Sequence, residues 1–191
     1  MADLCTRVWD GRGHVTQVGV VTALAGYVHW KGTGRKVVGV GDASGMLPSD
    51  SAVNQYDAEM ADQFDALVAP KGYPWKLRDI LPEVLVAGDD AGSLTEEGAK
   101  LLDPTGTLEA GVPLCPPEGD AGTGMTATNS VAERRGNVSA GTSILAMALL
   151  QRPPSAVSPA TPMVTPPPGK PTPTVPCNHP TPATPPPPPP P

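Results

Sequence analysis

Residues 112–150 read VPLCPPEGDAGTGMTATNSVAERRGNVSAGTSILAMALL, and this stretch decides how the rest of the sequence is interpreted. Its first glycine-rich turn, EGDAGTG, follows a short apolar segment and precedes small residues that favour a closely packed helix start. We expect Asp120 of this turn to stand at the end of the apolar strand. From the residues alone, an aspartate at such a junction is either an ordinary helix N-cap or a carboxylate that takes part in chemistry.

The second glycine-rich turn is AGTS at residues 140–143, which lies between strand-like segments at residues 136–139 and 144–150. This pattern predicts a β-hairpin. Its backbone amides and hydroxyls could face a phosphate, although glycine clusters are also ordinary turns. A nearby carboxylate would suit phosphoryl transfer, because it can accept a proton from the attacking hydroxyl. The sequence has no GxxxxGK[ST] run, which excludes a P-loop enzyme.

Upstream of these turns, the sequence predicts alternating helices and strands. Residues 22–30 are expected to form a buried helix, and residues 36–40 a short strand between two turns. Residues 54–68 predict an amphipathic helix. Its apolar positions, which we assign to the core, are Met60, Phe64, Leu67 and Val68. Ser93 and Glu96 have capping-box spacing ahead of another short helix, so the overall pattern indicates an α/β architecture.

Composition separates a body from a tail after residue 150. Most of the 27 prolines lie in residues 151–191, where they remove backbone donors and fix φ. This Pro-rich tail is therefore predicted to be disordered, with polyproline II character. Such a tail is either a spacer, an unselected sequence or a docking segment for an SH3-type or WW-type domain.

Charge and apolar patterning argue against several classes of partner. The formal net charge is −6, and no run of lysine or arginine occurs, so nucleic acid and membrane surfaces are not expected as partners. No apolar stretch approaches the roughly 20 residues of a membrane-spanning helix, and the N-terminus does not resemble a secretory signal. A cytoplasmic location is the expectation. The three cysteines are widely spaced, and we interpret them as reduced thiols and not as a zinc site.

Several separated segments resemble the middle of FGGY-family carbohydrate kinases. The segments are TALAGYVHWKGTGRKVVGVGDASGM, YDAEM, PKGYPWKLRDILPEVLVAGDDAGSLTEEGAKLLDPTG and PLCPPEGDAGTGMTATNSVAERRGNVSAGTS. They occur in the family's order and cover roughly residues 3–150. The resemblance implies a ribonuclease H-like, actin-like ATPase fold of class α/β, in which sugar and ATP meet between two domains. Residues 1–110 would be the C-terminal part of the first domain, residues 111–150 the start of the second, and residues 151–191 the tail.

The resemblance also implies a reaction and its residues. Asp120 matches the family's catalytic base, which takes the proton from the sugar hydroxyl that attacks the γ-phosphate of ATP. Gly141, Thr142 and Ser143 match the hairpin beside the phosphates. The implied substrates are a ketose or polyol and ATP with its Mg²⁺, and no protein metal site is expected. Glu118 is interpreted as a solvated loop carboxylate, with a water-mediated magnesium contact as the alternative.

Other polar residues are expected to have structural roles. Asp42 of GDASG is interpreted as an N-cap or turn residue, with a place at the sugar pocket as the alternative. His29 and Trp30 are expected to pack and not to ligate. Trp75 is expected to anchor its loop to the body. Arg134 and Arg135 precede the hairpin and are assigned to a solvent-facing turn, with a phosphate contact as the alternative.

Elements that the family uses are missing from this sequence. A DxGTT-like phosphate loop and a glycine-rich adenine-binding motif are absent, and only MVTPPPGKPTPTVPCN resembles the family's continuation, MVTTPDGKPVAMVHCN. We therefore expect a kinase fragment that is inactive by itself, because phosphoryl transfer depends on positioning two substrates. The alternatives are a noncatalytic interaction protein with a docking tail and a degraded gene product.

Overall fold

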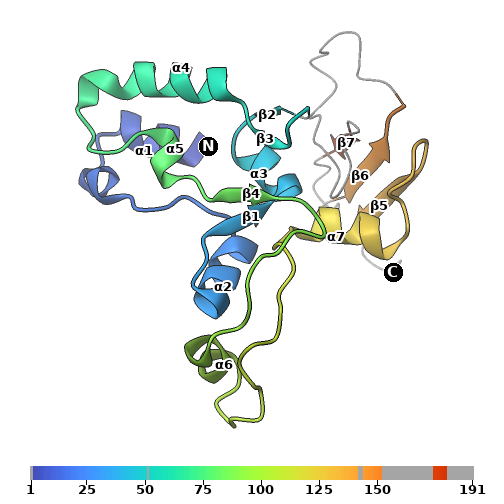
Figure 1. Cartoon of the computed structure of the whole chain (residues 1–191). Helices are drawn as coiled ribbons and strands as arrows, with labels where there is room; N and C mark the ends of the chain where they lie inside the picture. The colour runs from blue at the N-terminus through green and yellow to red at the C-terminus, as the bar shows by residue number, and fades with distance from the viewer. Residues whose placement is uncertain (1, 51, 142–143, 152–173, 180–191) are drawn as a thin grey trace, which may run out of the picture.

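The computed structural model describes residues 2–50, 52–141, 144–151 and 174–179, and Figure 1 shows their arrangement. At the centre, strand β1 (Val37–Gly39) pairs in parallel with strand β4 (Glu83–Leu85), and Val38 stands opposite Val84. All three residues of β1 are buried. Burial on both faces explains why this strand is a continuous apolar run, as parallel strands usually are.

The connection from β1 to β4 contains several helices of the body. It passes through α3 (Val40–Met46), the two-stranded pair β2 (Ser49–Asp50) and β3 (Gln55–Tyr56), α4 (Ala58–Val68), the 3-10 helix η2 (Ala69–Lys71) and α5 (Leu77–Ile80). The N-terminal α1 (Ala2–Trp9) and the 3-10 helix η1 (Gly13–Gln17) pack with α4 and α5. This packing forms the largest apolar core, whose members include Val8, Val15, Phe64, Val68, Trp75 and Leu77.

Helix α4 forms within the predicted amphipathic segment, but its buried face differs from the predicted one. It starts at Ala58, because Asp57 is its N-cap and the Asp57 carboxylate accepts a hydrogen bond from the Met60 N–H at 2.9 Å. Phe64 and Val68 are buried, as predicted. Met60 and Leu67 are 46% and 56% exposed, so their assignment to the core was wrong. The buried stripe is instead completed by Ala61, whose small side chain lets α4 lie close to the core.

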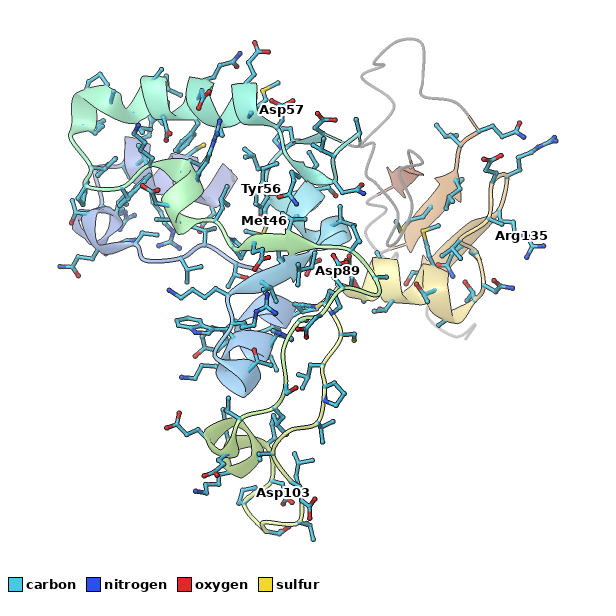
Figure 2. All side chains as sticks on the ribbon, in the orientation of Figure 1. Met46, Tyr56, Asp57, Asp89, Asp103 and Arg135 are labelled. Carbon is cyan, nitrogen blue, oxygen red and sulfur yellow. The ribbon has the colours of Figure 1, made fainter. Side chains whose placement is uncertain are left out.

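Two further helices differ from the sequence expectation. Helix α2 (Leu24–Thr33) buries only one face, since Leu24 is 77% exposed while Gly26 and His29 are buried. Residues 40–46 form α3, where a turn was expected. Its Val40, Ala43 and Met46 side chains pack against β1 and β4, and Figure 2 shows Met46 beside Tyr56 of β3.

The chain next makes a long excursion away from the sheet. Helix α6 (Glu96–Leu102) lies in this excursion, and its N-cap is Thr95, whose hydroxyl accepts the Gly98 N–H at 3.0 Å. The predicted Ser93 cap was therefore wrong. Beyond α6, the Asp103 carboxylate accepts hydrogen bonds from the Thr105, Thr107 and Leu108 amides. Figure 2 shows Asp103 at the far end of the excursion.

The chain then returns to the sheet and enters α7 (Asp120–Ala127), which is followed by a three-stranded antiparallel sheet. Strands β5 (Gly136–Ala140) and β6 (Ile144–Leu149) form the predicted hairpin, and β7 (Thr174–His179) pairs with β6 on its other side. The expectation of disorder was wrong for β7, whose Pro176 stands opposite Met147. As an edge strand, β7 occupies the place in a sheet that tolerates proline. The remainder of the tail prediction, residues 152–173 and 180–191, lies outside the described residues.

No helix among the residues that the structure describes is long and apolar enough to span a membrane.

Candidate active site

Three carboxylates gather where the segment that starts α7 contacts the start of α3. Asp42 lies in the first turn of α3, Glu118 lies two residues before α7, and Asp120 is the first residue of α7. The two segments are joined through their main chains, because the Gly39 N–H donates to the Pro117 carbonyl oxygen at 2.7 Å. Contacts at this junction therefore cross the predicted domain boundary at residues 110 and 111, and that boundary stays a prediction.

Glu118 binds the start of α3. Its Oε1 accepts a hydrogen bond from the Gly41 N–H at 2.9 Å, and its Oε2 accepts one from the Asp42 N–H at 3.2 Å. The first amides of a helix have no partner within the helix, so this carboxylate satisfies two of them. Burial raises the pKa of Glu118, the hydrogen bond from Gly41 opposes the rise, and the negative charge of Asp42 adds to it. The interpretation of Glu118 as a solvated loop carboxylate was wrong.

Asp42 makes the reverse contact, from α3 to the start of α7. It is the third residue of α3 and not its N-cap, which is Gly39. Its carboxylate interacts with the N–H of Gly119, at the start of α7. Burial raises the pKa of Asp42, the Gly119 contact lowers it, and the negative charge of Asp120 raises it further. The predicted capping role of Asp42 is therefore replaced by a link between α3 and α7.

Two glycines lie where these carboxylates meet the opposite backbone. A Cβ added at Gly39 would collide with the Glu118 carboxylate, and a Cβ added at Gly119 would collide with Oδ1 of Asp42. A side chain at either position would therefore displace one of the two carboxylates.

Asp120 has an exposed carboxylate at the N-terminus of α7. Its Oδ1 accepts the N–H of the next residue, Ala121, at 2.9 Å. The Thr123 hydroxyl lies 3.0 Å from the Gly119 carbonyl oxygen and 3.1 Å from the Asp120 carbonyl oxygen, and it braces this first turn. The N-cap of α7 is Gly119, so the capping interpretation of Asp120 was wrong. The expected strand before it is reduced to a single bridge between Ser93 and Pro113.

Helix α7 also packs on the hairpin, which connects the junction to the predicted phosphate turn. Met125 is completely buried against Met147 and Leu149 of β6. The Asn137 amide of β5 donates to the Thr128 hydroxyl at 2.9 Å. Gly141 is exposed at the hairpin turn.

Thr142 and Ser143, the other two predicted turn residues, lie outside the described residues. The prediction that this turn faces Asp120 across a shared crevice therefore stays a prediction.

His29 and Trp75 have the structural roles expected of them. His29 is 5% exposed, and its Nε2 lies 2.9 Å from the Ala91 carbonyl oxygen. The Trp75 indole N–H donates to the Val15 carbonyl oxygen at 2.8 Å and its ring stacks on Tyr73, so it anchors its loop as predicted.

The arginine pair before the hairpin also lies where the sequence placed it. Arg134 adopts a positive φ of 61°, its N–H donates to the Leu149 carbonyl oxygen at 3.1 Å, and the side chains of Arg134 and Arg135 are exposed. Figure 2 shows Arg135 at the outer edge of the hairpin, as a solvent-facing turn requires.

A cavity of about 400 Å³ opens beside α7. Its walls include Cys115, Glu118, Thr123 and Thr126, and the Thr123 and Thr126 hydroxyls are bonded to the helix backbone. No group of three or more metal-binding side chains occurs within the described part of the chain. The site is thus an acidic junction without a metal cluster of its own among these residues.

Solved carbohydrate kinases have the same fold. A xylulose kinase from Brucella ovis matches with a TM-score of 0.68 and 18% identity, over 91% of this chain and 33% of that kinase. A xylulose kinase from Lactobacillus acidophilus matches with a TM-score of 0.68 and 14% identity, over 91% of this chain and 33% of that kinase. A glycerol kinase from Plasmodium falciparum, solved with ADP, matches with a TM-score of 0.66 and 16% identity, over 91% of this chain and 33% of that kinase. The chain thus spans about a third of the length of these kinases.

No protein-family model matches the sequence, and no curated protein matches it. The structural similarity shows that the described residues adopt part of the actin-like ATPase fold found in sugar kinases, as the resemblance to the FGGY family implied.

Proposed function

We propose that this chain carries the central part of an ATP-dependent FGGY-type carbohydrate kinase. The observation that supports this most strongly is the structural match to several carbohydrate kinases over 91% of the chain. The acidic junction adds chemical support, because it presents an exposed carboxylate at the start of α7. The proposed substrates are MgATP and a ketose or polyol, and the proposed location is the cytoplasm.

In the proposed reaction, Asp120 is the general base. It accepts the proton of a sugar hydroxyl as that oxygen attacks the γ-phosphorus of ATP, and the bond from phosphorus to the bridging oxygen breaks to release ADP. The proposed phosphate contacts are the backbone amides and hydroxyls at Gly141, Thr142 and Ser143. Mg²⁺ enters bound to ATP and offsets negative charge on the transferred group.

We further propose that the 191-residue chain does not complete a turnover by itself. Phosphoryl transfer depends on holding two substrates in line, and the compared kinases use a chain about three times as long.

The test is an ADP-release assay with a panel of ketoses and polyols. It uses both the 191-residue chain and a chimera in which this chain replaces the structurally matching segment of a solved xylulose kinase. The chimera is expected to release ADP with at least one sugar, and the chain alone is not. Asp120→Asn keeps the shape and removes the proton acceptor, so it should lower kcat by about 10²-fold or more. Wild-type kcat in the Asp120→Asn chimera would reject Asp120 as the base.

A further inference from the structure

The contacts between α3 and α7 form a reciprocal clasp, which we define as Gly41, Asp42, Glu118 and Gly119. The Glu118 carboxylate, from the segment before α7, contacts the backbone of α3, and the Asp42 carboxylate, from α3, contacts the backbone at the start of α7. Glu118 accepts the Gly41 and Asp42 amides at 2.9 and 3.2 Å, and Asp42 interacts with the Gly119 N–H. The residues involved are separated by 76 or 77 positions in the sequence. The clasp therefore joins two parts of the chain that no local structure would hold together.

The position of the clasp relative to Asp120 suggests what it does. Asp120 directly follows Gly119, and the charge of Asp120 acts on Asp42. At the other end, α7 is fixed by Met125 in the apolar core of the hairpin. The clasp holds the start of α7, where Ala121 also packs against the hairpin core, and Met125 is buried within that core.

The electrostatics of the junction oppose a role in stability alone. Burial is the main reason that the pKa values of Asp42 and Glu118 are raised, and repulsion from a neighbouring carboxylate adds to it, so the ionised junction is less favourable than a neutral one. Charges gathered in this way are typical of functional sites, where geometry is maintained at a cost in stability.

We infer that Glu118 is a positioning residue: its carboxylate fixes the start of α7, and with it the Asp120 carboxylate, against the first turn of α3. The inference rests on the proposed function, since it assigns Glu118 to the placement of the proposed base. Glu118 itself does not touch substrate in this role. Its two oxygens are bonded to main-chain amides, so it acts through α7.

The first experiment follows backbone amides of the full 191-residue chain by NMR during a pH titration from about pH 3 to about pH 8. The measurement is made in an Asp42→Asn background, so that the side chain of residue 42 does not itself titrate. The amides of residues 41 and 42 should then report the Glu118 carboxylate that they contact, and both responses should disappear when Glu118→Gln is added. The matched control is Glu97→Gln, because Glu97 lies exposed in the first turn of α6. The control should leave both responses unchanged. Persistence of the responses in Glu118→Gln would overturn the clasp.

A second measurement separates positioning from simple helix capping. The Gly119 amide reports the titration of Asp42, and Asp120→Asn should lower that midpoint because it removes a neighbouring negative charge. If Glu118 places Asp120, this effect of Asp120→Asn should be clearly smaller in a Glu118→Gln background. An equal effect in both backgrounds would overturn the inference. If Glu118→Gln is unfolded by circular dichroism, Glu118→Asp serves instead, because it keeps the charge but shortens the reach by one methylene.

Activity of the chimera provides a third readout and distinguishes this inference from the proposed function. Glu118→Gln is expected to lower kcat by roughly 10- to 10²-fold with little change in the KM for ATP, since the base is displaced but the nucleotide site is not. Wild-type kcat in Glu118→Gln, together with loss of kcat in Asp120→Asn, would overturn the positioning role and leave the kinase proposal standing. If no sugar gives ADP release, the kinase proposal fails, while the NMR titrations still decide the clasp.

Discussion

Replacing Gly39 by alanine should separate α3 from α7. The added Cβ would occupy the space of the Glu118 carboxylate and would come within 2.6 Å of the Glu118 Cγ. The carboxylate can move away only by giving up its bonds to the Gly41 and Asp42 amides. A hydrogen bond to a charged group contributes about 1.5–3 kcal/mol when buried and less when partly exposed, so the two bonds together suggest a loss of about 2–4 kcal/mol.

The assay is urea unfolding of the 191-residue chain, followed by far-UV circular dichroism. The control is Gly45→Ala, made in α3, the helix that Gly39 caps, at a position where a Cβ would meet nothing within 4 Å. Alanine is favoured over glycine in a helix, so the control should be neutral or more stable by up to about 1 kcal/mol. In a Glu118→Ala background, Gly39→Ala should cost much less, because the colliding carboxylate is gone. Equal unfolding free energies for Gly39→Ala and Gly45→Ala would refute the reasoning.

Three further predictions concern pH, a buried hydroxyl and a helix cap. The pKa values of Asp42 and Glu118 are raised above their ordinary 3.8 and 4.5, so the folded state binds more protons than the unfolded state, and the free energy of unfolding should fall as pH rises through the raised values. Asp42→Asn should flatten this fall when urea unfolding is measured upward from about pH 4. An unchanged dependence of the unfolding free energy on pH would contradict the prediction. The Tyr56 hydroxyl is buried without a hydrogen-bond partner among the described residues, and burial raises its pKa. Tyr56→Phe should therefore be neutral or stabilising by up to about 1 kcal/mol in thermal unfolding. A clear loss of stability would show that the hydroxyl has a partner. Thr95→Ala should cost about 1 kcal/mol through loss of the α6 cap, while Ser93→Ala should change stability little, and the reverse order in urea unfolding would restore Ser93 as the cap.

Local signals in the sequence identified the hairpin, the amphipathic helix and the loop anchor. Strands β5 and β6 pair antiparallel as the predicted hairpin, because small turn residues separate two strand-like segments. Phe64 and Val68 were predicted to be buried from helical spacing alone. Trp75 was predicted to anchor its loop to the body, and its indole N–H donates to a main-chain carbonyl, as buried tryptophan usually does.

Features that depend on distant contacts could not be predicted in this way. Helix α3 contains Gly41 and Gly45, which lower its intrinsic helix propensity, and it forms because its apolar residues pack on the sheet while Glu118 satisfies its first amides. No nearby residue predicts a partner 77 positions away. Strand β7 was missed for a related reason, since Pro176 disfavours a strand except at the edge of a sheet that other segments have already formed.

The packing of α7 has a mechanical consequence. This helix has eight residues, which at 1.5 Å per residue gives a rod of about 12 Å. Its second half is seated in the hairpin core at Met125, and Asp120 lies at the opposite end. Asp120 and Met125 are five residues apart, about 7.5 Å along the helix axis, so a rotation of α7 by about 10° about Met125 would move Asp120 by about 1.3 Å. The clasp at the start of α7 opposes such a rotation, so the position of the Asp120 carboxylate depends on contacts to α3 as well as on the hairpin core.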